Sequence, residues 1–196
     1  MTLHFATGPR NGNALVQQGM NKLSKRHNPL SALALDFSTL KVQQPHAVYD
    51  LRADLVADGG GLESAAASGF RYLVEGNGTS VAAAEVLADA AGTATLLANI
   101  NFGQFVGATA HALAQVATLP DVRANSYEVR LLRFSAIALM ALWLKPDSGG
   151  ADIIFPLAPA PGGLHAEQSY SEADFIKAIR PLAQKRASKT DQTMLP

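Results

Sequence analysis

Cysteine is absent from this chain of 196 residues. A chain without cysteine has no disulfide bond, thiol nucleophile, zinc–thiolate site or iron–sulfur cluster. Its length is sufficient for a core without such cross-links, because a domain of this size buries roughly 70% of the surface that its unfolded chain exposes. We therefore expect a globular protein held together by apolar packing, with no cofactor.

Charge is also scarce in this sequence. Only 16% of the residues are charged and the formal net charge is zero, so the composition does not indicate nucleic-acid binding. The charges are unevenly distributed: residues 1–46 carry five Lys and Arg against one Asp, whereas residues 47–100 carry seven Asp and Glu against two Arg. These segments could dock within the chain or between subunits, although two ordinary solvated faces explain the same pattern more simply.

The sequence lacks an apolar run long enough to span a membrane. Residues 90–120 contain no Asp, Glu, Lys or Arg, but Asn, Gln, Gly and Thr interrupt them, and the apolar run 134–144 has 11 residues. A membrane helix needs about 20 mostly apolar residues, and the first residues do not resemble a signal peptide. We expect a cytoplasmic protein with no membrane partner, in which both runs are buried.

What the sequence does contain is a series of strand and helix patterns. The clearest is a hairpin in which the runs 70–74 and 81–86 flank an Asn77-Gly78 pair, because Asn-Gly supplies the positive φ angles of a tight turn. Period-two alternation and apolar runs predict further strands at 49–55, 127–133, 137–144 and 152–157, and 3.6-residue periodicity predicts helices at 104–117 and 171–182. Short connections between successive strands favour antiparallel pairing. The predicted fold is α+β, with a mainly antiparallel sheet of about five to six strands and helices packed on it.

The pattern also suggests how the chain is divided. Residues 1–46 contain one helical stretch and are interpreted as a partly helical N-terminal arm. Residues 47–186 are predicted to form the single α+β domain. Pro181 is expected to kink or end the last helix, and residues 187–196 are predicted to form a flexible tail.

Six segments between residues 47 and 186 form a recognisable pattern. They are Gly69-Phe70-Arg71-Tyr72-Leu73-Val74, Val81-Ala82-Ala83-Ala84-Glu85, Tyr127-Glu128-Val129-Arg130-Leu131-Leu132-Arg133, Ala141-Leu142-Trp143-Leu144, Ile154-Phe155-Pro156-Leu157-Ala158-Pro159 and the helix from Tyr170 to Pro181. Together these segments resemble a family of uncharacterised bacterial α+β proteins, and no assigned activity comes with the resemblance. Phe70 departs from the pattern, which has Trp at this position.

Three acids four residues apart form one candidate metal site. Asp50, Asp54 and Asp58 would share one face of a helix, where their carboxylates could gather a divalent cation. If the same segment is a strand, they are its solvated side. The strand interpretation is favoured, so no metal is expected.

His111 is the candidate catalytic residue. It lies within an apolar helical pattern, so we expect it to be partly buried, and a buried histidine beside a carboxylate such as Glu85 could act as a general base. A histidine that only fills space in the core is the commoner arrangement. The pairing with Glu85 is suggested by chemistry and not by spacing.

Arg130 and Arg133 are candidates for an anion-binding site. Both lie on the predicted strand that also contains Glu128. The alternative is that these charges form ion pairs across the sheet.

No group of polar residues with the spacing of a known catalytic motif emerges from these candidates. The leading hypothesis is therefore a non-enzymatic binding or accessory domain that self-associates or holds a protein partner. The alternatives are a small hydrolase that uses His111 with a nearby carboxylate, and a small-ligand-binding domain. The residues expected to line such a ligand pocket are Phe102, Phe105, Tyr127 and Trp143.

Overall fold

The computed structural model describes residues 3–24 and 39–193, and the side chains of residues 189–193 are not described. The strands are β1 (Leu3–Phe5), β2 (Lys41–Asp50), β3 (Ala66–Gly76), β4 (Thr79–Ala88), β5 (Ala94–Asn101), β6 (Tyr127–Phe134), β7 (Leu139–Pro146), β8 (Ile153–Pro156) and β9 (Tyr170–Ser171). The α-helices are α1 (Gly12–Ser24), α2 (Ala53–Ala57), α3 (Gln104–Val116), α4 (Pro120–Ala124) and α5 (Glu172–Thr193). Two short 3₁₀ helices are η3 (Leu62–Ser64) and η4 (Ser135–Ile137).

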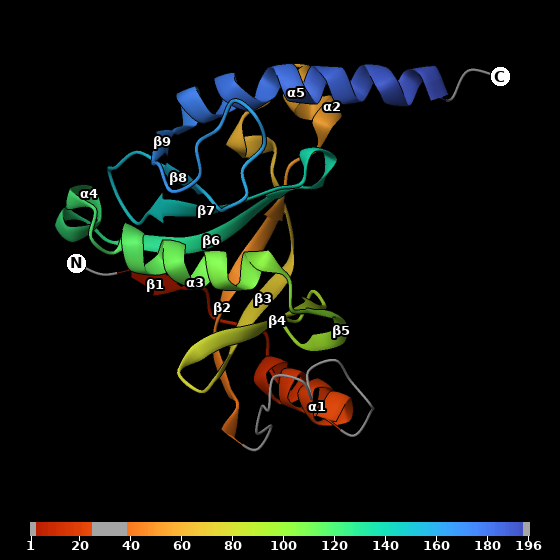
Figure 1. Ribbon diagram of the computed structural model, residues 1–196, viewed down its shortest axis with the longest axis vertical. Coiled ribbons are helices and arrows are strands. Elements are labelled where there is room, and N and C mark those ends of the chain that lie inside the picture. The colour runs from red at the N-terminus through yellow and green to blue at the C-terminus, as the bar shows by residue number, and fades with distance from the viewer. Residues whose placement is uncertain (1–2, 25–38, 194–196) are drawn as a thin grey trace.

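One mixed sheet of nine strands forms the centre of the molecule (Figure 1). Its order is β5-β4-β3-β2-β6-β7-β8-β9, and β1 pairs with β6 off this path. Strands β2 and β1 lie one after the other along the same edge of β6, and both run parallel to it, whereas the remaining pairs are antiparallel. The α+β class and the mainly antiparallel character of the sheet were correct, but the predicted number of five to six strands was wrong.

The strands that were not predicted from the sequence were missed for identifiable reasons. β1 and β9 contain three and two residues, too few for a period-two pattern to be recognised. β5 has the sequence ATLLANIN and no regular alternation. The parallel pair β2–β6 could not be inferred from short connections, because a long crossover separates its two strands.

The described residues before position 47 include two segments of the sheet, β1 and the first half of β2, so the predicted boundary between an arm and the domain is not observed there. β2 begins at Lys41 and lies between β3 and β6, so a boundary at residue 46 would cut through a central strand. At the other end, α5 continues past Pro181 to Thr193, so Pro181 does not end this helix and residues 187–193 are helical. Residues 25–38 and 194–196 lie outside the described part of the chain.

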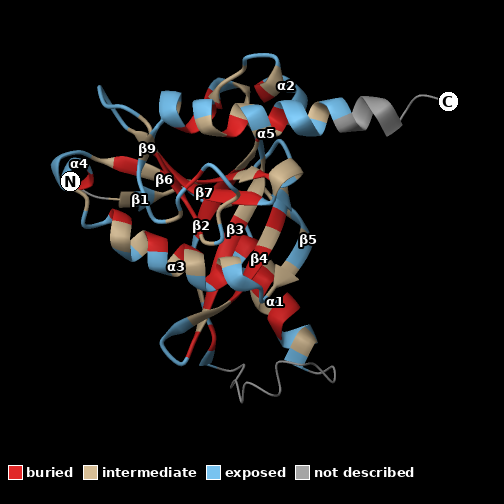
Figure 2. Cartoon of the chain, turned by 45° about the horizontal axis from the view of Figure 1, so that its top comes forward, coloured by how far each residue is buried: buried red, intermediate tan, exposed pale blue. Residues whose placement is uncertain are grey.

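Helices cover both faces of the sheet. α3 packs on one face over Val129 and Leu131 of β6, and α5 packs on the opposite face over Leu132 and Phe134 of the same strand. α1 lies on the same face as α5 but over β3 and β4, where it contributes Val16 to a third cluster. Figure 2 shows the buried residues concentrated in the sheet between these helices. Among the described residues, no helix is both long and apolar enough to cross a bilayer.

The predicted hairpin is confirmed. β3 and β4 pair antiparallel around Asn77 and Gly78, whose φ angles are 53° and 77°. Positive φ at both positions matches the right-handed twist of the strands that the turn joins. Of the predicted strand at 49–55, only the first two residues lie in a strand, since β2 ends at Asp50 and residues 53–57 form α2.

Two glycines allow a test of this backbone argument. Gly78→Ala is expected to lower the free energy of unfolding by about 1 kcal/mol, because a Cβ is strained at positive φ although it would meet no atom within 4 Å. Gly107→Ala in α3 also meets no atom within 4 Å, and it should raise the free energy by about 0.5–1 kcal/mol through helix propensity. Urea unfolding of both variants measures the change in the free energy of unfolding, which should have opposite signs in the two variants. Equal effects would contradict the explanation.

Candidate functional site

Four adjacent strands place charged and polar side chains on the face of the sheet that α3 covers. His46 of β2 lies opposite Arg71 of β3, and Arg71 lies opposite Glu85 of β4. Asp50 at the end of β2 lies opposite Arg133 of β6. We call these five residues the sheet cluster. Directly paired residues share one face, so the register alone brings these five side chains together.

The acids and arginines of the sheet cluster form one continuous ion network. Glu85 accepts from Arg71 Nη1 at 3.3 Å and from Arg133 Nη1 at 2.9 Å. Arg133 also donates to both carboxylate oxygens of Asp50, at 2.6 and 3.0 Å. Glu85 is therefore the shared counter-ion of two arginines, and its removal would affect both.

Burial and pairing shift the pKa values within this network. Partial burial on its own would raise the pKa of Asp50, but the hydrogen bonds and charge of Arg133 hold it below its usual value. The bond to Asp50 raises the pKa of Arg133 in return. Burial lowers the pKa of Arg71, and the charge of Glu85 opposes that effect. Arg71 has no exposed surface, so its charge depends on its neighbours and not on solvent.

Two members of the sheet cluster have polar atoms without a hydrogen-bond partner among the described residues. These atoms are Nε and Nη2 of Arg71 and Nε2 of His46, which is 1% exposed. His46 Nδ1 donates to the Arg71 carbonyl at 3.3 Å. Since a carbonyl oxygen only accepts, the neutral ring carries its proton on Nδ1 and presents the Nε2 lone pair. Burial is the main cause that lowers the pKa of His46 to about 4, so the ring is neutral at pH 7.

His46 borders a cavity of about 280 Å³ between α3 and strands β1 to β4. Its rim is polar, and Gln43 Nε2 donates to Glu75 Oε2 there at 2.8 Å. Its floor is formed by the buried residues His46 and Leu73. The lining residues are Phe5, Gln43, Gln44, His46, Leu73, Glu75, Ser80, Ala110 and Leu113.

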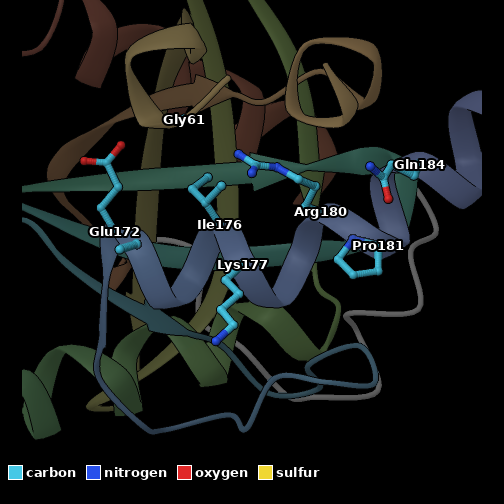
Figure 3. A pocket seen from close by; sticks show the side chains of 8 residues that line it. Gly61, Glu172, Ile176, Lys177, Arg180, Pro181 and Gln184 are labelled. Atoms are coloured by element: carbon cyan, nitrogen blue, oxygen red, sulfur yellow. The ribbon is translucent and has the colours of Figure 1, made fainter. Parts of the chain in front are cut away.

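A second cavity of about 460 Å³ lies between α5 and the segment around Gly61 (Figure 3). Glu172 accepts from the Leu62 backbone amide at 2.9 Å, and Arg180 donates to the carbonyls of Val56 and Gly59. In Figure 3, these two side chains extend toward the Gly61 segment, whereas that of Lys177 points away from it. The polar groups of this cavity thus attach α5 to the α2–η3 segment, and we interpret it as structural.

The structure does not bring the candidate catalytic pair together. His111 lies on α3 with 60% of its side chain exposed, and its Nε2 is 3.5 Å from Oε1 of Glu167. Glu85 is instead bonded to Arg71 and Arg133. The expectation that His111 is partly buried was wrong, because it lies on the solvated side of an amphipathic helix.

The three candidate metal ligands are also separated by their partners. Asp50 ends β2 and pairs with Arg133, Asp54 lies on α2 and pairs with Arg52, and Asp58 follows α2. Within the described ranges, no group of three His, Asp or Glu residues could hold a metal ion.

Arg130 and Arg133 do not form one anion site, because residues three apart on a strand face opposite sides of the sheet. Arg130 pairs with Glu128 at 3.0 Å and stacks on the rings of Tyr49 and Trp143, with centroid distances of 4.8 and 5.0 Å. Both arginines form ion pairs across or along the sheet, as the alternative interpretation proposed.

The residues predicted to line an aromatic ligand pocket also lie on opposite faces of the sheet. Tyr127 belongs to the core under α3, whereas Trp143 belongs to the core under α5. Phe102 lies at the surface with 38% of its area exposed. These residues therefore do not line one cavity.

Sequence reasoning missed His46 and Arg71. His46 lay in the segment interpreted as an arm. Arg71 was visible as a charged residue within the apolar run 70–74, and a charge inside a strand that is otherwise apolar is a usable signal for a buried ion pair.

Comparisons with known proteins give no relative for this chain. No family model matches it. No curated protein and no solved structure matches it either. The resemblance to a family of uncharacterised bacterial proteins therefore stays a prediction, and the function must be argued from the geometry.

Proposed function

We propose that this protein is a non-enzymatic binding domain that self-associates by pairing its β5 edge with β5 of a second copy. The observation that carries the proposal is the edge itself. Among the described residues, β5 pairs with β4 along one side only, apart from a bridge between Arg10 and Thr93 at its start. The other side of a terminal strand offers backbone donors and acceptors to an additional strand.

Apolar side chains next to this edge support the proposal. Leu96 of β5 is 52% exposed, and its cross-strand neighbour Leu87 of β4 is 38% exposed. Phe102, which follows β5, is also exposed. Large apolar side chains grouped beside an open strand edge are typical of an interaction surface. We call these three residues the β5 patch.

The absence of charge on β5 favours a second copy of this chain as the binding partner. When a strand pairs with its own copy about a twofold axis, a residue near the axis lies close to the same residue of the second copy, so a charge there would meet a like charge. No Asp, Glu, Lys or Arg occurs from residue 90 to residue 120, which includes all of β5. Protein edges are usually protected from such pairing by charged residues, and β5 lacks them. Two register shifts toward β4 limit the length of regular pairing, so we expect a modest affinity.

Leu96→Lys is expected to weaken self-association at least tenfold, which corresponds to about 1.4 kcal/mol. The lysine would place two positive charges close together across the twofold axis. Analytical ultracentrifugation over a series of protein concentrations measures the dimer dissociation constant. Leu55→Lys is the matched control, because Leu55 on α2 is 38% exposed and lies away from β5.

Hydrogen exchange shows where any dimer forms. Amides of β5 should exchange more slowly at high protein concentration than at low concentration, while amides of α5 should not change. The proposal would be contradicted if the wild-type protein stayed monomeric. It would also be contradicted if Leu55→Lys weakened the dimer as much as Leu96→Lys does.

A further inference from the structure

We propose that the cavity above His46 binds a small primary ammonium ligand with a short apolar chain. The inference does not rest on self-association, because the cavity lies under α3 and includes no residue of β5. Three features carry it: an unpartnered acceptor on the floor, a carboxylate at the rim, and apolar walls between them.

The floor presents an acceptor that needs a donor. His46 Nδ1 donates to the Arg71 carbonyl, so Nε2 carries a lone pair, and this atom has no hydrogen-bond partner among the described residues. The ring is 1% exposed, and a polar atom buried this deeply is normally bonded. A ligand that donates a hydrogen bond to Nε2 would satisfy it.

The rim adds negative charge. Glu75 accepts a hydrogen bond from Gln43 but forms no ion pair within 4.0 Å with any Lys or Arg of the described segments. Ser80 lies directly opposite Glu75 on β4 and lines the same cavity. An ammonium group has three donors and a positive charge, so it can donate a hydrogen bond to Nε2 of His46 on the floor, and the Glu75 carboxylate at the rim attracts its charge. An anionic ligand would meet the Glu75 carboxylate, and the positive charge of Arg71 opposite His46 is balanced by Glu85 and lies outside the cavity lining, so an anion is disfavoured.

The walls suit the remainder of such a ligand. Phe5, Leu73, Ala110 and Leu113 contribute apolar surface to the cavity, and the Phe5 ring meets the His46 ring edge to face at a centroid distance of 5.1 Å. A short alkyl chain would be covered by these side chains while its ammonium group reaches His46 on the floor. A metal ion is a weaker candidate, because the described residues supply no third His, Asp or Glu ligand.

Titration of the full-length protein with n-butylammonium chloride at pH 7 tests the proposal. Long-range ¹H–¹⁵N NMR follows Nε2 of each histidine, and we expect a saturable shift at His46 with no change at the exposed His111. Glu75→Gln keeps the shape of the rim and removes its charge, so it should weaken binding at least tenfold. n-Butanol, which keeps the chain and lacks the charge, should bind more weakly than n-butylammonium.

Several outcomes would overturn this inference. They are the absence of a saturable shift at His46, equal binding by the wild type and Glu75→Gln, and equal shifts at His46 and His111. A Zn²⁺ titration that shifts His46 when n-butylammonium does not would also overturn it and would indicate a metal site. The test does not require substitution of His46, so it does not depend on whether a change in the core folds.

Discussion

Glu85→Gln is expected to lower the free energy of unfolding by about 3 kcal/mol. Glu85 is the shared counter-ion of Arg71 and Arg133, at 3.3 and 2.9 Å. Arg71 has no exposed side-chain surface, so solvent cannot replace the lost charge. The substitution preserves the shape of the side chain, and the expected loss therefore comes from a buried arginine without a counter-ion and not from a cavity.

Urea unfolding measures this effect, and Asp54→Asn is its control. Asp54 pairs with Arg52 at the surface, where the two side chains are 50% and 68% exposed, so the same chemical change should cost much less than Glu85→Gln does. A double-mutant cycle with Arg71→Met makes the argument specific, since Glu85→Gln should cost less once the buried charge is gone. Equal costs in both backgrounds would show that Arg71 does not depend on Glu85.

Acidification from pH 6.5 to pH 4 is expected to cost about 3 kcal/mol of stability through His46 alone. The pKa of His46 is lowered from 6.5 to about 4, mainly by burial. Within this range the unfolded chain binds a proton at His46 that the folded chain does not, so stability falls as the pH falls. Below the folded pKa both states are protonated and the loss from His46 is complete. Arg133 holds the pKa of Asp50 below its usual value in the folded protein, so Asp50 adds its own loss as the pH falls through and below the usual range of an Asp carboxyl.

Unfolding curves at a series of pH values test this expectation. His46→Gln should flatten the decline between pH 6.5 and 4, whatever its effect on stability at pH 7. His111→Gln, at a histidine whose side chain is 60% exposed, is the matched control. If His46→Gln folds too poorly, NMR titration of the wild type gives the His46 pKa directly. A value near 6.5 would refute the argument.

Local patterns were read correctly where the local chain decides the structure. The Asn77–Gly78 turn and α3 were predicted because a two-residue turn and a helical face are encoded by neighbouring residues. The strand prediction for residues 49–55 was wrong for a related reason. Their alternating pattern fits a strand, but the chain leaves the sheet at Asp50 and begins α2 at Ala53. β5 was missed because an edge strand partly under a helix has no regular alternation.

The candidate sites depend on contacts between residues distant in sequence. Glu85 was singled out, but its partners Arg71 and Arg133 lie 14 and 48 residues away. His111 was chosen from its apolar neighbours, but only the packing of α3 determines which of its sides faces solvent. His46 was overlooked because nothing local shows that its strand lies between β3 and β6.

The sequence by itself determined the α+β class, the β3–β4 hairpin and the absence of thiol chemistry, since each follows from composition or from residues close along the chain. Only the tertiary structure decided the nine-strand order, the parallel pairing of β2 with β6 and the sheet cluster. The physical reason is that strand register couples residues tens of positions apart. Whether a charge is buried beside its counter-ion or left in water is decided by that register and not by the charge's own neighbours in the sequence.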